Sequence, residues 1–224
     1  LATQNFTTAT DNYNVGIGYN ADGGLTTGVQ NTLIGGLAGD ALTTSANNVA
    51  IGFEALSTET AYSANTAIGY RALKVNSGGY ANTAVGFDAL LANTSALNNT
   101  AVGHAALTAN TTGRWNQSLG SGSGGGVTTG DDNTLVGYLA GNSTTVLATG
   151  SQNTLIGNLS HTSATDTTYA NGMGYNVNAV AGYTTVGKNA EDIAAAHGNA
   201  TWATVSDERV KKDIEDATAG LAFI

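Results

Sequence analysis

The sequence predicts an all-β repeat protein in which short strands stack into a β-solenoid, a β-roll or a triple β-helix. Three observations predict this fold: an asparagine recurs with a constant 17-residue period, a glycine follows each asparagine after four residues, and a short apolar run lies between them. A fixed period with a fixed apolar core is typical of repeat architectures. The repeat-defining residues are Asn14, Asn31, Asn48, Asn65, Asn82, Asn99, Asn116, Asn133 and, after an insertion, Asn153.

Composition supports an ordered chain whose repeats are not helical. The 224 residues include 31 glycines and no proline, and only 10% are charged. Disordered chains usually carry high net charge and proline, so low charge with periodic aliphatic residues indicates order. Because the helix formers Glu, Lys, Gln, Arg and Met are scarce, the composition disfavours a helical repeat.

Charge and residue usage also restrict the partners. A net charge of −9 disfavours binding to nucleic acid, which depends on Lys and Arg. Cysteine is absent, and His104, His161 and His197 share no metal-ligand spacing, so neither a metal nor another cofactor is expected. No apolar run approaches the roughly 20 residues of a membrane helix, so membrane insertion is not expected. The chain opens on Leu1 and not on Met, and we expect it to be a piece of a longer polypeptide.

Residues 65–81 show how one repeat is built. The first five, Asn-Thr-Ala-Ile-Gly, indicate a short strand, and the apolar pair Ala72 and Leu73 follows before a polar stretch typical of turns. Such a repeat is too short for a strand and a crossover helix, so we expect a rung of two short strands and two turns. The glycine is expected where the chain bends or needs a positive φ.

Both faces of the first strand are non-polar. Thr66 and Ile68 share one face, and Ala67 points to the other because strand side chains alternate. A strand that is apolar on both faces is buried on both. We expect one face to line the rung's own core and the alanine-rich face to meet another copy of the chain. Since thin rungs bury little area alone, the sequence predicts an oligomer.

The repeat becomes irregular toward the C-terminus. The step from Asn133 to Asn153 is longer than the others, which predicts a three-residue insertion in a turn. Ala170 replaces the next asparagine, and the step from Gly174 to Gly187 is shorter than the period. The glycine-rich residues 120–126 lie inside an intact repeat and indicate a rung or loop, not a linker or a phosphate loop. We divide the chain into a lead-in (1–13), regular repeats (14–150), irregular terminal repeats (151–190) and a different C-terminal segment (191–224).

The C-terminal segment carries its own motif. Residues 202–205 indicate a strand, and residues 206–214, Ser-Asp-Glu-Arg-Val-Lys-Lys-Asp-Ile, precede an apolar tail that is expected to be helical. With Trp202 just upstream, this motif resembles the opening of the intramolecular chaperone of phage tail fibres and tailspikes, the peptidase S74 family. The resemblance implies the start of a small α+β chaperone that trimerises the fibre and then cuts itself off.

The same resemblance implies the site of self-cleavage. The cut falls between Val205 and Ser206, with Ser206 as nucleophile, Lys211 as its base and Asp207 assisting. The chemistry is consistent with these residue types, because a serine hydroxyl needs an adjacent base and lysine serves as one when it is partly neutral. No activity on an external substrate is expected.

The repeats carry a second resemblance. Asn-(Thr/Val)-Ala-(Ile/Val)-Gly is similar to the head repeats of trimeric autotransporter adhesins, which form trimeric parallel β-rolls, and to repeats in phage fibre shafts. Together the two resemblances imply a homotrimeric shaft or tip of a bacteriophage tail fibre, extracellular on the virion. They imply as partners two further copies of the chain, other virion tail proteins and a host surface glycan or protein. The open alternatives are a bacterial trimeric adhesin head and a β-helical spike that binds or degrades polysaccharide.

Two columns of the repeat have competing interpretations. The asparagines are expected to cap turns or to form an amide ladder between rungs, with ion or sugar binding as the alternative. The aromatic column Phe53, Tyr70 and Phe87, with His104 next in phase, is expected to pack between rungs, with a carbohydrate-stacking strip as the alternative.

Overall fold

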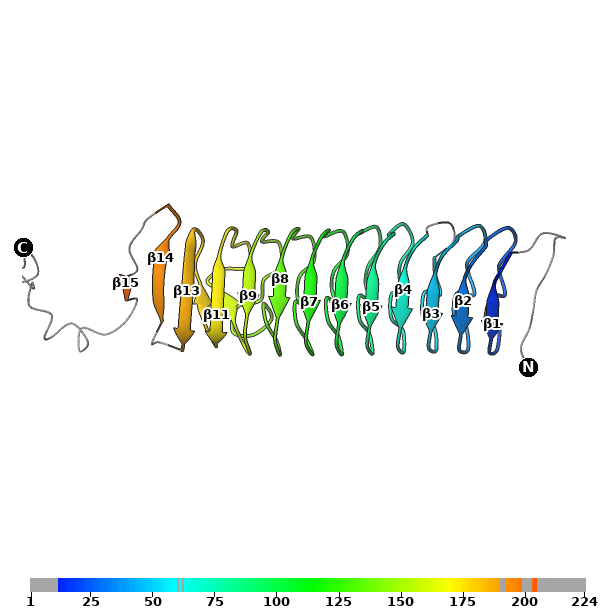
Figure 1. The fold of residues 1–224 in the computed structure, drawn as a ribbon, viewed down its shortest axis with the longest axis horizontal. Helices are drawn as coiled ribbons and strands as arrows, with labels where there is room; N and C mark the ends of the chain where they lie inside the picture. Colours follow the sequence, from blue (N-terminus) through cyan, green and yellow to red (C-terminus); the bar gives the residue numbers. More distant parts are fainter. Residues whose placement is uncertain (1–11, 60, 62, 190–191, 199–202, 205–224) are drawn as a thin grey trace, which may run out of the picture.

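The chain is a β-solenoid in which short parallel strands stack along one axis (Figure 1). The computed structural model describes residues 12–59, 61, 63–189, 192–198 and 203–204. The regular rungs contribute β1 (Val15–Ile17), β2 (Thr32–Ile34), β3 (Val49–Ile51), β4 (Thr66–Ile68), β5 (Thr83–Val85), β6 (Thr100–Val102), β7 (Gln117–Leu119), β8 (Thr134–Val136) and β9 (Thr154–Ile156). The predicted all-β repeat fold is therefore confirmed.

The stack continues beyond the regular rungs. β11 (Asn171–Tyr175) and β13 (Tyr183–Lys188) extend the parallel sheet, and β14 (Ile193–Ala196) and β15 (Ala203–Thr204) pair antiparallel at its end. These strands complete a 13-stranded sheet. β10 (His161–Thr162) and β12 (Asn178–Ala179) form a separate two-stranded parallel sheet.

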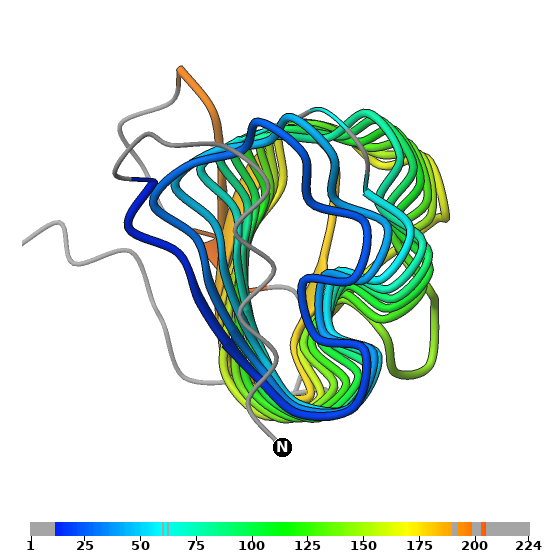
Figure 2. The ribbon, with the colours of Figure 1, turned by 90° about the vertical axis from the view of Figure 1, so that its right-hand side faces the viewer.

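Strand register survives the changes in repeat length. Thr134 pairs with Thr154 across the longer repeat, and Gly174 pairs with Gly187 across the shorter one. The longer repeat places its extra residues in a turn closed by a bridge between Asn142 and Val146, seen in Figure 2 as the yellow-green loop that protrudes from the stack. The insertion was thus correctly predicted to lie in a turn.

Each regular rung contains one strand, so the prediction of two strands is wrong. The pair Ala72 and Leu73 lies in a turn, and Leu73 has a φ of 51°, in the left-handed region that a strand does not use. This part of the rung still bonds to its neighbour, because the Leu73 N–H donates to the Ala89 carbonyl at 3.0 Å. The turns therefore stack rung on rung without being extended.

The alanine-rich face points into the solenoid's own core, so its predicted contact with another copy is wrong. Ala50, Ala67 and Ala84 are fully buried within the single chain and belong to the same core cluster as Leu56 and Leu73. In β3–β6, leucines from the turns fill the narrow interior and the strand contributes only a methyl group. In β2, β8 and β9 the strand itself supplies the buried leucine, namely Leu33, Leu135 and Leu155. The outward face is instead the one that carries Thr66 and Ile68, both half-buried.

Candidate functional site

The asparagine column is a buried hydrogen-bonded ladder. Asn82 Oδ1 accepts the backbone N–H of Asn99 at 3.0 Å, and Asn82 N–H donates in turn to Asn65 Oδ1 at 3.0 Å. Asn82 Nδ2 donates to the Ala96 carbonyl at 2.9 Å. Because Asn82 is fully buried and its amide is used by the backbone, this column holds rungs together and offers nothing to an ion or a sugar.

A second buried polar ladder was missed by the sequence reasoning. Asn93 Nδ2 donates to Asn76 Oδ1 at 2.6 Å, Asn110 Nδ2 to Asn93 Oδ1 at 3.4 Å, and Asn76 Nδ2 to Glu59 Oε2 at 2.5 Å. All four side chains are fully buried. Asn76, Asn93 and Asn110 repeat with the same period as the first column, and this spacing is the signal that could have found them.

The aromatic column packs between rungs. Ring centroids lie 5.7 Å apart for Phe53 and Tyr70, 4.9 Å for Tyr70 and Phe87 and 5.3 Å for Phe87 and His104, with interplanar angles of 16°, 13° and 11°. The Arg71 guanidinium lies 5.0 Å from the Tyr70 ring centre. Sugar stacking needs a free ring face, and neighbouring rings cover the inner faces of this column. The aromatic column therefore stabilises the stacking of the rungs and is poorly suited to bind carbohydrate.

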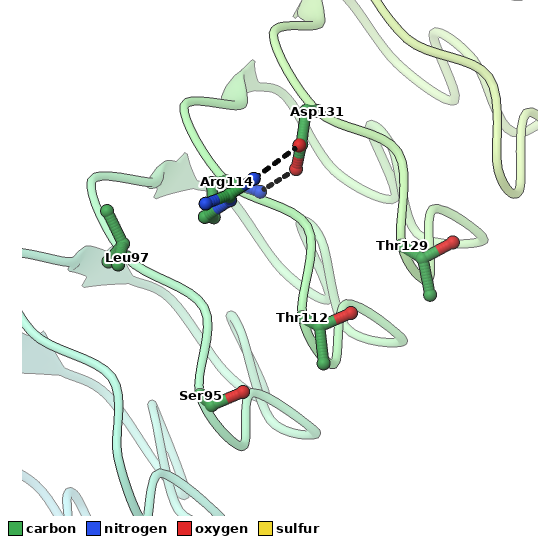
Figure 3. Close-up of a pocket in the computed structure, with 6 residues that line it drawn as sticks. All are labelled: Ser95, Leu97, Thr112, Arg114, Thr129 and Asp131. Atoms are coloured by element: carbon green, nitrogen blue, oxygen red, sulfur yellow. Dashed lines mark hydrogen bonds and ion pairs between the residues drawn. The ribbon is translucent and has the colours of Figure 1, made fainter.

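An open polar groove crosses three consecutive rungs (Figure 3). Its volume is about 400 Å³, and its lining residues are Ser95, Leu97, Thr112, Arg114, Thr129 and Asp131. The backbone N–H of Arg114 donates to Asp131 Oδ1 at 2.7 Å, and the Arg114 guanidinium donates to Asp131 Oδ2 at 3.1 Å. The sequence reasoning missed this groove because its residues share one side only when the rungs are in register.

A second pocket lies at the end of the stack. It has a volume of about 290 Å³ and is lined by Asn178, Val180, Tyr183, Thr185 and Ala194. Asp192 is buried in the same terminal region, and burial raises the pKa of its carboxyl against the opposing effects of a backbone hydrogen bond at Asn178 and of His161. This part of the chain adjoins residues that the structure does not describe.

The predicted cleavage residues Ser206, Asp207 and Lys211 lie outside the described residues, as does Val205 on the other side of the expected cut. The described strand β15 ends at Thr204. Within the described part of the chain, no three His, Asp or Glu side chains come together as a metal site. No helix in that part is long and apolar enough to span a bilayer. A comparison with protein-family models, with curated proteins and with solved structures finds no match to this chain.

Proposed function

We propose that this chain is the shaft of a homotrimeric bacteriophage tail fibre that contributes to attachment to the host. The observation that carries the proposal is the outward face of the long sheet. Its third strand position holds an aliphatic residue or methionine in each of β1–β9 and in β11. Ile17, Leu119, Ile156 and Met173 are 49%, 53%, 39% and 45% exposed, and the others are half-buried. A continuous apolar row of this kind, flanked by a row of mostly threonine, is typical of an interaction surface.

A second copy of the chain is the occupant that fits this face. No outward position of β2–β9 carries a charged residue, although the chain has a net charge of −9. Like-charged copies can therefore approach along this face without repulsion between opposed side chains. The face is also periodic, so three copies in parallel register can turn it toward one threefold axis, with each rung at the level of the same rung in its neighbours. Threefold association closes such a contact into a shaft.

The oligomeric state tests this proposal. Light scattering after size-exclusion chromatography is expected to give three times the 22.4 kDa chain mass. Ile68→Asp is expected to dissociate the trimer, because it places a charge in the apolar row, while circular dichroism keeps the β signal. Thr44→Asp, at an exposed turn position, serves as the control and is expected to leave the mass unchanged. A monomeric wild-type chain rejects the proposal.

We also propose self-cleavage between Val205 and Ser206 by the C-terminal segment. Mass spectrometry of the chain expressed from its complete gene is expected to show this cut, and Ser206→Ala is expected to abolish it. Ser163→Ala, at an exposed position of the terminal repeats, is the matched control and is expected to leave the cut in place. An uncut wild-type chain contradicts the assignment of Ser206, Asp207 and Lys211.

A further inference from the structure

Two adjacent rows of hydroxyl side chains run along the turns before β6, β7 and β8, and they are used differently. In the first row, Thr94 Oγ1 and Thr111 Oγ1 each donate to a carbonyl one rung further on, both at 3.0 Å. In the second row, the side chains are exposed and make no hydrogen bond within the described residues (Figure 3). The second row consists of Ser95, Thr112 and Thr129. The first row fastens rungs together, and the second is free to bind a ligand.

The opposite side of the groove presents a fixed, charge-balanced pair. Arg114 is held by two hydrogen bonds to Asp131, and its guanidinium lies 4.7 Å from the centre of the Trp115 ring. The pair therefore loses little conformational entropy when a ligand binds. Leu97, half-buried one rung before Arg114, adds an apolar contact beside these polar groups. The planar Arg114 and Asp131 groups can hydrogen-bond to the hydroxyls at the edge of a sugar ring, and Leu97 can contact the C–H bonds on its face.

The spacing between rungs and the net charge of the chain indicate which class of ligand fits the groove. Neighbouring rungs are about 4.8 Å apart, which is close to the length of one sugar residue in an extended chain. Because consecutive sugars of an extended β-linked chain alternate in orientation, Ser95 and Thr129, two rungs apart, meet the same edge of their sugars, and Thr112 meets the opposite edge of the sugar between them. A polyanion is disfavoured, because Arg114 is neutralised by Asp131 and the chain as a whole carries a charge of −9.

From these observations we propose that the groove binds an extended, neutral, β-linked oligosaccharide, with one sugar residue on each of the three rungs. The proposal rests on the attachment role proposed above and names the chemical class that the shaft would contact.

Binding can be tested with chitotetraose and cellotetraose as probes, by saturation-transfer NMR and isothermal titration calorimetry on the whole chain. At least one of these probes is expected to bind, and Thr112→Val is expected to weaken it about threefold to tenfold through loss of one hydrogen bond. The matched control is Thr44→Val, in the same row four repeats earlier and outside the groove, which is expected to leave binding unchanged. Because Thr112 is exposed, its variant is expected to fold normally.

Three results would overturn the proposal: no binding of either probe, an equal loss with Thr44→Val, or equal binding of the coiled α-linked maltotetraose. Light scattering on the same samples tests the trimeric fibre separately from binding in the groove. A trimer that binds no probe rejects the groove alone. A monomer that binds a probe with the expected variant response rejects the trimeric fibre and supports the groove.

Discussion

Gly86→Ala is expected to destabilise the solenoid by about 3–4 kcal/mol, the sum of backbone strain and a steric clash. Gly86 has a φ of 141°, and a Cβ added there would lie 2.3 Å from the carbonyl oxygen of Gly103 in the next rung. That oxygen belongs to the backbone, so relief requires the rungs to separate. Because each rung contacts only its neighbours, the damage is expected to uncouple the rungs on either side.

Gly78→Ala is the matched control for this prediction. A Cβ at Gly78 would lie 3.6 Å from the Thr94 carbonyl oxygen, an ordinary contact, and Gly78 has no positive φ. Its replacement is expected to change stability by less than about 1 kcal/mol. Guanidinium unfolding followed by circular dichroism measures both variants. If the two lose the same stability, the glycine column is not a steric requirement of the stack.

Asn82→Ala is expected to cost about 3 kcal/mol, because it leaves one buried backbone N–H without an acceptor and takes one of two donors from a buried carbonyl. The Asn99 N–H loses its acceptor, Asn82 Oδ1 at 3.0 Å, and the Ala96 carbonyl loses a donor at 2.9 Å. Water cannot replace these groups easily, since Asn82 is fully buried and Asn99 is 1% exposed.

Asn158→Ala provides the comparison for the ladder. Asn158 is exposed, and its side chain makes no hydrogen bond within the described residues. The free energy of unfolding of this variant is expected to lie within about 0.5 kcal/mol of the wild-type value. Thermal and guanidinium unfolding of both variants give the comparison. A loss at Asn158 as large as that at Asn82 would show that burial in the ladder is not the cause.

The constant period and the glycine in each repeat made the fold predictable from the sequence. The constant step between asparagines predicts the stack, and the glycine four residues after each asparagine does mark a positive φ, for example 137° at Gly69. Which face of the strand points into the core was not predictable. Alternation separates the two faces, but it does not say which one is inside when both are apolar. The second strand was wrongly predicted at Leu73, because nothing in the local sequence indicates that this aliphatic residue has a φ of 51°.

The candidate sites were predictable only in part. The aromatic column could be read from the sequence because one residue type repeats in phase. Ser95, Thr112 and Arg114 could not be recognised as one groove, because three different residue types meet there only through the register of the rungs. The buried ladder that ends at Glu59 was obscured in the same way, since its first member breaks the asparagine pattern.

The tolerance of strand register to repeat length has a consequence for how such a protein can change. The longer repeat leaves Thr134 paired with Thr154, and the shorter one leaves Gly174 paired with Gly187, so the difference in length falls on the segments that connect the strands of the long sheet. Mutation can therefore lengthen, shorten or replace a turn while the sheet is inherited intact. Changes in the shape of the turn surface are thereby separated from the sheet that supports it, and a small insertion can remodel that surface without a new fold.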